Sequence, residues 1–174
     1  MSLLAYADES VRRDYLICAA VVPAADVGTV RRRTRDLCLP GQRRWHFAKE
    51  SNPRRRKILS ELTGCGLFRV VICEARGDDA AARAACLSEL LPALADLGVT
   101  GLTIESRQGQ DSIDRRTVHV AMDKLSLPLE YAHRRPHEEC CLWCADAIAW
   151  AYGAGGDWRR RVLPLVDTVR RARP

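Results

Sequence analysis

The chain opens with two short apolar runs, 3–7 and 15–22, that are separated by only a few polar residues. Runs of this kind indicate buried strands, and two strands so close together most simply pair as an antiparallel hairpin. Three further strand-like runs follow, separated from one another by helical patterns: 67–73, 100–105 and 127–131. We therefore expect an α/β fold with a central mixed five-stranded sheet flanked by helices.

Helical periodicity occupies most of the remaining chain. Asn52 followed by Pro53 is a favourable helix start, and Asp78 or Asp79 is placed to cap a long Ala- and Leu-rich helix that Pro92 should bend or split. The helices expected from periodicity and end signals cover 26–37, 52–63, 78–98, 111–124, 138–152 and a basic C-terminal stretch from Asp157 that bends at Pro164. At 174 residues, these elements fit one domain that spans 1–174.

Basic residues are concentrated in one part of the chain. The whole protein carries 28 Lys and Arg against 22 Asp and Glu, yet the segment 31–57 alone holds eleven basic and two acidic residues. Such a charge run could be a solvated face or a phosphate-binding surface. Trp45 and Phe47 add aromatic rings that could stack on bases. The candidate nucleic-acid contacts in this segment are Arg43, Arg44, His46, Arg54 and Arg55.

The sequence carries no signal for a membrane or for export. It has no run of eighteen apolar residues, and its N-terminus lacks a basic region followed by an apolar segment. We therefore expect a cytoplasmic protein with no membrane partner. Eight cysteines are present, but Cys18 and Cys73 fall inside strand-like runs, where a thiol serves as a small core residue in a reducing compartment.

Three acidic residues stand where the fold could bring them to one site. Asp8 and Glu105 each follow an apolar strand, at the end where open α/β sheets carry their sites. Asp146 lies inside an apolar helical stripe, where an ionised carboxylate is costly unless it is paired or bound to a metal. If the three converge, they form an all-oxygen site of the kind that holds Mg²⁺ or Mn²⁺. Each could instead cap a turn or pair with one of the many arginines.

Other polar residues have structural explanations beside functional ones. Glu9 should point to the opposite face of the strand from Asp8 and act as a supporting or turn residue. Asp111 and Asp114 are spaced like a helix capping box, with a catalytic role for Asp111 as the alternative. His46 is either a packed core histidine or a catalytic one.

Zinc, serine-nucleophile and phosphate-loop chemistry find little support. His137, Cys141 and Cys144 share a helix face, but no second ligand pair such as Cys-x-x-Cys appears, so a structural zinc site is not favoured. The chain has no G-x-S-x-G elbow and no G-x-x-x-x-G-K-[ST] loop. The absence of these two motifs excludes serine-nucleophile and phosphate-loop chemistry.

Four short segments, taken together, resemble a known family. They are Tyr6-Ala7-Asp8-Glu9-Ser10, Trp45-His46-Phe47, Ile104-Glu105-Ser106-Arg107 and Leu142-Trp143-Cys144-Ala145-Asp146-Ala147-Ile148-Ala149. In this order they resemble the DUF3800 family of uncharacterised bacterial proteins, which is similar to the ribonuclease H-like, or retroviral integrase-like, superfamily. The resemblance touches nearly the whole chain.

The resemblance implies a fold and a site. The implied sheet has three antiparallel strands followed by parallel ones, with acidic residues gathered on two Mg²⁺ or Mn²⁺ ions. Asp8 matches the family's first-strand aspartate, Glu105 matches the glutamate of its Glu-Ser-Arg segment, and Asp146 matches the aspartate of its final helix. His46 matches a histidine often found in the same place.

The residues and the resemblance together favour a divalent-metal-dependent nuclease that hydrolyses phosphodiester bonds of nucleic acid. Asp8 would bridge two ions about 4 Å apart, and Glu105 and Asp146 would each complete one of them. Arg107, just beyond Glu105, could hold a phosphate oxygen. The basic segment 31–57 could track the backbone.

The chain departs from the family's pattern at two positions. Val11 replaces a common glycine, and Trp143 replaces the usual glutamine of the final helix. Two alternatives therefore stay open. One is a nucleic-acid-binding module with the same fold and no turnover, and the other is a metal-dependent phosphohydrolase with a small substrate.

Overall fold

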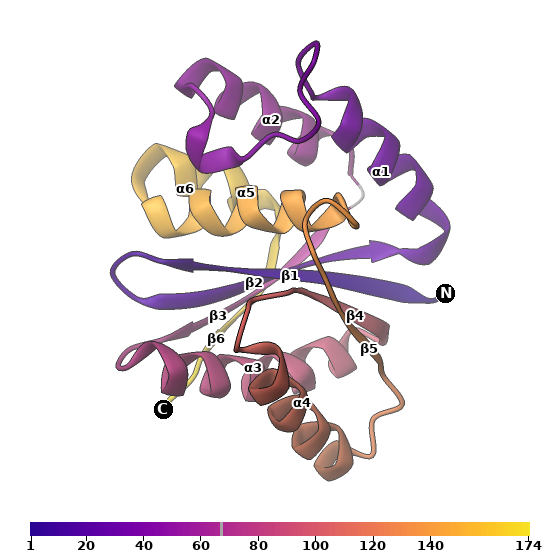
Figure 1. The fold of residues 1–174 in the computed structure, drawn as a ribbon, viewed down its shortest axis with the longest axis vertical. Helices are drawn as coiled ribbons and strands as arrows, with labels where there is room; N and C mark the ends of the chain where they lie inside the picture. Colours follow the sequence, from indigo (N-terminus) through magenta and orange to yellow (C-terminus); the bar gives the residue numbers. More distant parts are fainter. Residues whose placement is uncertain (67) are drawn as a thin grey trace.

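The computed structural model describes residues 1–66 and 68–174, in which six strands form one sheet (Figure 1). The strands are β1 (Leu3–Val11), β2 (Tyr15–Pro23), β3 (Arg69–Ala75), β4 (Val99–Glu105), β5 (Glu130–Arg134) and β6 (Val166–Arg171), in the spatial order β5-β4-β1-β2-β3-β6. The helices are α1 (Val27–Asp36), α2 (Asn52–Gly64), α3 (Asp79–Asp96), α4 (Asp111–Leu125), α5 (Cys141–Ala154) and α6 (Gly156–Val162). Short 3₁₀ turns occupy Ala24–Asp26, Phe47–Lys49 and Leu163–Leu165.

The first three strands form an antiparallel meander, and β4 and β5 continue the sheet in parallel with β1. The predicted hairpin and the order of antiparallel and parallel strands are thus confirmed. One detail differs. The hairpin closes where Val11 pairs with Tyr15, so β1 runs three residues beyond Asp8. Asp8 therefore lies inside the strand, opposite Cys18, and not at its end.

The sixth strand corrects the expected five-stranded sheet and the expected C-terminal helix. Helix α6 ends at Val162, and residues beyond Pro164 become β6, which pairs in parallel with the edge strand β3. Proline removes the amide that would have continued the helix, whereas β3 offers a row of unpaired backbone groups. Arg69 of β3 and Asp167 of β6 form an ion pair of 2.5 Å across the new edge.

Several boundaries shift by a few residues. The strand expected at 127–131 is found at Glu130–Arg134, because the parallel register pairs Gly101 of β4 with Glu130. The helix expected from 138 begins at Cys141, and α3 runs through Pro92 without a break. The strand expected at 67–73 begins at Arg69 among the described residues, and its predicted start at Leu67 lies outside them.

Helices cover both faces of the sheet, with α1, α2, α5 and α6 above it and α3 and α4 below it in Figure 1. Each side has its own apolar core. The upper core joins the sheet to α5, and the lower core joins it to α3 and α4. Helix α5 packs directly on the sheet, and ten of its fourteen residues are buried. A single ionised side chain, Asp146, interrupts this apolar helix.

No helix among the described residues is both long enough and apolar enough to span a bilayer.

Candidate metal centre

The fold brings Asp8, Glu105 and Asp146 together on the upper face of the sheet. Ala7 of β1 pairs with Ile104 of β4, so Asp8 and Glu105 are next to one another along parallel strands. Ala7 and Ile104 belong to the lower core, and side chains alternate along a strand, so the two carboxylates face α5. Asp146 projects from α5 near enough for its charge to act on both.

Burial raises the pKa of all three acids, and repulsion between carboxylates adds to the shift at Asp8 and Glu105. Burial raises the pKa of Asp8 well above its usual range, and the charges of Glu105 and Asp146 raise it further. Burial likewise raises the pKa of Glu105 and of Asp146. The charge of Arg44 opposes these shifts at all three carboxyls without reversing them. The positive charge of Arg44 therefore does not compensate the three carboxylates.

One oxygen of this group has no hydrogen-bond partner among the described residues. Asp146 Oδ2 is shielded from solvent and accepts no hydrogen bond from residues 1–66 or 68–174, and Arg44 Nε is likewise buried and donates none to them. Asp8 accepts one hydrogen bond of 2.8 Å from the Glu9 amide and hydrogen-bonds to Glu105. Buried polar atoms are nearly always satisfied in folded proteins, so an orphaned carboxylate oxygen beside two further carboxylates is suited to bind a divalent cation.

The Asp8→Asn variant should be more stable than the wild type when metal is absent. Because the folded state holds the pKa of Asp8 above its unfolded value of about 4, the wild type loses stability as pH rises from there through the raised pKa. At pH 7.5 in EDTA, Tm should rise by at least about 2 °C, since 1 kcal/mol moves Tm by about 2–4 °C at this size. Thermal unfolding between pH 4 and pH 8 measures the effect, which should shrink toward pH 4.

The matched control is Asp123→Asn, which removes one charge from an exposed position on α4. This control should leave Tm within about 1 °C of the wild type, as surface substitutions away from special features usually do. An Asp8→Asn protein that is less stable than the wild type at pH 7.5 would contradict the mutual repulsion of the three carboxyls.

A second polar cluster lies under the same strands, on the lower face. Glu9 points away from Asp8, as the strand alternation predicted, and forms ion pairs with Arg83 and Arg107. Arg83 comes from α3, is 3% exposed, and donates to both carboxylate oxygens of Asp114 at 2.9 and 2.7 Å. The expected capping box of Asp111 and Asp114 is wrong, because the N-cap of α4 is Gln110 and Arg83 binds the Asp114 side chain in the lower core.

Asp111, Asp114 and His133 offer ligand atoms that lie within 4.8 Å of one another, and no other group of three in the described parts of the chain is gathered so tightly. This cluster has the donor atoms to bind a metal, but its carboxylate oxygens already accept hydrogen bonds from neighbouring residues. Both oxygens of Asp114 bind Arg83, and Asp111 accepts hydrogen bonds of 2.6 and 2.8 Å from the Ser106 hydroxyl and the Arg107 amide. Burial acts to raise the pKa of Asp114, yet the hydrogen bonds from Arg83 and His133 hold it below its usual range. A cation would have to displace the guanidinium.

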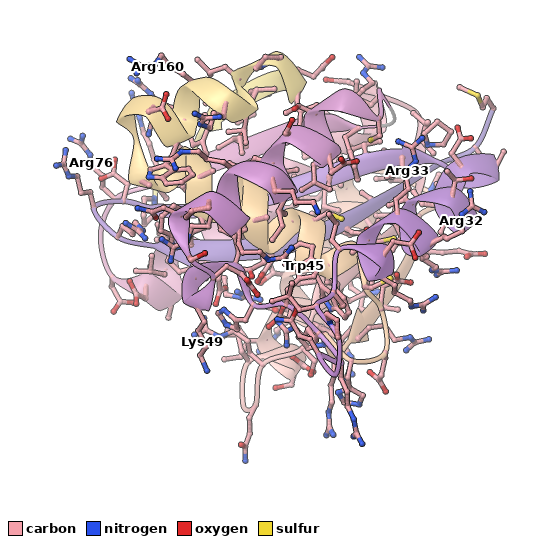
Figure 2. All side chains as sticks on the ribbon, turned by 90° about the horizontal axis from the view of Figure 1, so that it is seen from above. Arg32, Arg33, Trp45, Lys49, Arg76 and Arg160 are labelled. Atoms are coloured by element: carbon pink, nitrogen blue, oxygen red, sulfur yellow. The ribbon has the colours of Figure 1, made fainter. Side chains whose placement is uncertain are left out.

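The aromatic residues of the basic segment do not form a stacking surface. Trp45 and Phe47 are both fully buried, and Trp45 packs edge-on against Trp143 at 5.6 Å between ring centroids. Figure 2 shows Trp45 near the middle of the molecule. His46 between them is exposed, so the core-histidine interpretation is wrong, and its charge acts on Asp146.

The predicted phosphate contacts separate into two groups. Arg54 and Arg55 use their guanidinium groups to hold the preceding loop, with bonds of 2.5 Å to the Leu37 carbonyl and of 3.0 Å to the Phe47 carbonyl. Arg43 is exposed, Arg44 is half-buried beside the three carboxylates, and Arg107 is exposed at the end of β4. The structure therefore brings Arg44 and Arg107 to the candidate centre and commits Arg54 and Arg55 to structural bonds.

The cysteine-rich turn before α5 also behaves as core. Cys140, Cys141 and Cys144 are buried while His137 is exposed, and the described residues do not gather three of these four side chains as one metal site would require. Burial raises the pKa of the Cys144 thiol to about 12. Trp143 is 4% exposed and donates a hydrogen bond of 2.6 Å to the Pro136 carbonyl. It fills the core and cannot serve as a binding surface.

Comparison with known proteins gives one informative result. No family model matches the chain, and no curated protein matches it either. A chain in the solved structure of the PCNA:RNase HII complex from Archaeoglobus fulgidus is similar in fold, with a TM-score of 0.57 and 17% sequence identity. The match covers 94% of this chain and 76% of that chain. The protein therefore has a ribonuclease H-like α/β fold.

Proposed function

We propose that this protein is a divalent-metal-dependent nuclease of the DUF3800 family, with Asp8, Glu105 and Asp146 as the ligands of Mg²⁺ or Mn²⁺. The observation that carries the proposal is the orphaned Asp146 Oδ2, buried next to two carboxylates whose pKa values are raised. The similarity in fold to a chain from an RNase HII complex supports the proposal of a nuclease. Function still has to be argued from the site, because one fold serves many activities.

The donor set suits hard divalent cations. All three side chains offer carboxylate oxygens, the ligands that Mg²⁺ and Mn²⁺ prefer. Burial of these carboxylates is unfavourable, and a bound cation would offset that cost. When bound, such ions lower the pKa of a water and neutralise charge that develops on a phosphate. The sheet and α5 hold the carboxylates on rigid elements, which limits reorganisation during the reaction.

The surrounding residues have roles that do not depend on the ions. Arg107 is exposed at the end of β4, and its guanidinium pairs with Glu9, so it can bind a phosphate oxygen beside Glu105 from a fixed position. His46 lies close to Asp146 at the solvent side, where it can exchange a proton with the leaving group. No side-chain nucleophile is required.

Mn²⁺ titration calorimetry tests the metal centre. The wild type should bind Mn²⁺, and Asp146→Asn should weaken binding by at least about tenfold, because one ligand and one full charge are lost. Asp111→Asn is the matched control. It removes a carboxylate from the second cluster and should leave the Mn²⁺ affinity unchanged.

The same experiment can fail in a decisive way. Loss of Mn²⁺ binding in Asp111→Asn together with normal binding in Asp146→Asn would move the metal to the Asp111, Asp114 and His133 cluster. If the wild type bound no Mn²⁺ even with nucleic acid present, the nuclease proposal would fail and a nucleic-acid-binding module would be the remaining interpretation. A small-substrate phosphohydrolase would show metal-dependent turnover with only a shallow response to salt.

A further inference from the structure

Arginines line one end of the sheet, the edge formed by the C-terminal ends of five of its six strands. Strands β1, β3, β4, β5 and β6 all end there, because β2 is antiparallel to both of its neighbours and the other pairings are parallel. Each of these five strands ends at an arginine or within two residues of one: Arg12, Arg76, Arg107, Arg135 and Arg171. At the opposite end of the sheet, the starts of these strands have only Arg69. Arg69 is paired with Asp167, as Arg76 is with Asp14 and Arg107 with Glu9.

A large hollow of about 790 Å³ lies at this edge, directly after Glu105. We call it the α4 hollow, and its basic lining consists of Arg107, Arg115, Arg135 and His137. Among the described residues, the guanidinium groups of Arg115 and Arg135 take part in no ion pair. The lining also includes Asp111, and Arg107 is paired with Glu9, so the unpaired positive charge of the α4 hollow comes from Arg115 and Arg135.

A second hollow of about 310 Å³ lies at the same edge on the other side of β1. We call it the hairpin hollow, and its charged lining consists of the basic residues Arg12, Arg13, Arg76 and Arg159 together with the acidic residues Asp14 and Glu74. Arg76 is paired with Asp14 at 3.1 Å, whereas Arg12 and Arg13 take part in no ion pair among the described residues. Gly153 lets the hairpin approach α5 here, since a Cβ on it would lie 3.3 Å from the Ser10 hydroxyl. Arg12 lies 4.4 Å over the ring of Trp150, one helical turn beyond Asp146.

In the order of the strands, the three carboxylates lie between the two hollows. The α4 hollow adjoins β4 and β5, and the hairpin hollow adjoins the β1–β2 turn, β3 and the end of α5. From β5 to β3 the line of strand ends crosses four strand spacings, roughly 19 Å, which corresponds to about six phosphates at the ~3.4 Å axial spacing of one strand in B-form DNA and to fewer in an extended strand. A strand that followed this line would pass Glu105 and Asp8.

We propose that a single nucleic-acid strand binds along this edge, across the strand ends, with its phosphates in the α4 and hairpin hollows and the three carboxylates between them. The inference rests on the proposed function and deepens it, because it defines the strand's path. It also relocates the interface from the basic segment 31–57. Arg31 is paired with Glu139, and Arg54 and Arg55 hold the preceding loop.

Fluorescence anisotropy with labelled 20-nucleotide single-stranded DNA and RNA tests the path, in EDTA so that nothing is cleaved. Arg115→Ala/Arg135→Ala and Arg12→Ala/Arg13→Ala each remove from one hollow two charges that form no ion pair among the described residues. Each pair should lower affinity about tenfold at 150 mM salt and flatten the slope of log affinity against log salt by about 1.4. Arg32→Ala/Arg33→Ala removes the same charge from α1, at the other end of the molecule from Arg76 in Figure 2, and should change affinity by less than about twofold.

The outcomes separate the path from the activity. Arg115→Lys/Arg135→Lys keeps the charge and should restore affinity to within about threefold, which shows that Ala acts by loss of charge and not by misfolding. Weaker binding in the α1 pair, with both edge pairs unchanged, would overturn the path and leave the nuclease proposal standing. A wild type that bound neither oligonucleotide, in EDTA or in Ca²⁺, would overturn both. The two oligonucleotides together show whether the edge prefers DNA or RNA.

Discussion

The Asp8→Asn variant should keep its fold and lose metal-dependent cleavage of nucleic acid by about 10²–10³-fold. This is the usual cost of removing one preorganised electrostatic contact from an active site, and it equals about 3–4 kcal/mol of transition-state stabilisation. Asp8 interacts with both other members of the group, since it hydrogen-bonds to Glu105 and the charge of Asp146 raises its pKa. The measurement is the single-turnover rate on a labelled oligonucleotide with saturating Mn²⁺.

The control for this experiment combines activity with stability. Asp8→Asn should gain Tm in EDTA while it loses activity, because the repulsion that destabilises the metal-free protein is the same charge that holds the cation. Asp123→Asn, on the exposed face of α4, should change neither. Full activity in Asp8→Asn would show that the three carboxylates are not the catalytic centre.

The candidate centre could be predicted from the sequence because its signals are local. A charged residue inside the apolar helix α5 is unusual enough to mark Asp146, and an apolar run ending in a carboxylate marks Asp8 and Glu105. What the sequence could not supply was the register that pairs Ala7 with Ile104 and so turns both carboxylates toward α5.

The errors arose where long-range contacts decide the outcome. Strand β6 forms because β3 presents a free edge, which no local pattern in 166–171 reveals. Trp45 resembled a surface ring beside arginines, but it packs on Trp143, nearly a hundred residues away in sequence. The arginines beyond the strand ends were scattered through the sequence, and only the sheet topology places them along one edge.

Arg83 was also missed, since one arginine in an Ala- and Leu-rich helix carries no functional signal in the sequence. In the structure it is 3% exposed and neutralises two carboxylates, Glu9 and Asp114. Removing one partner from a buried ion pair usually costs about 3–5 kcal/mol, because the remaining charge stays buried. Arg83 therefore supports the ends of β1 and β4 from below.

Arg83→Met should accordingly destabilise the protein by about 3–5 kcal/mol at pH 7, a fall in Tm of roughly 10 °C. Urea unfolding at pH 7 and at pH 3.5 measures it. Because the pKa of Asp114 is lowered in the folded wild type, its contribution is present above the unfolded value of about 4 and is lost as pH falls through the folded value. The difference between the two proteins should therefore shrink at pH 3.5.

The matched control is Arg116→Met, which removes an exposed arginine from α4 and should cost less than about 0.5 kcal/mol. An equal loss of stability in Arg83→Met at both pH values would mean that lost packing, and not the buried charges, dominates. If the ion-pair network also positions Arg107 through Glu9, Arg83→Met should weaken oligonucleotide binding at a temperature where the variant is still fully folded. Binding equal to that of the wild type under those conditions would confine Arg83 to a structural role.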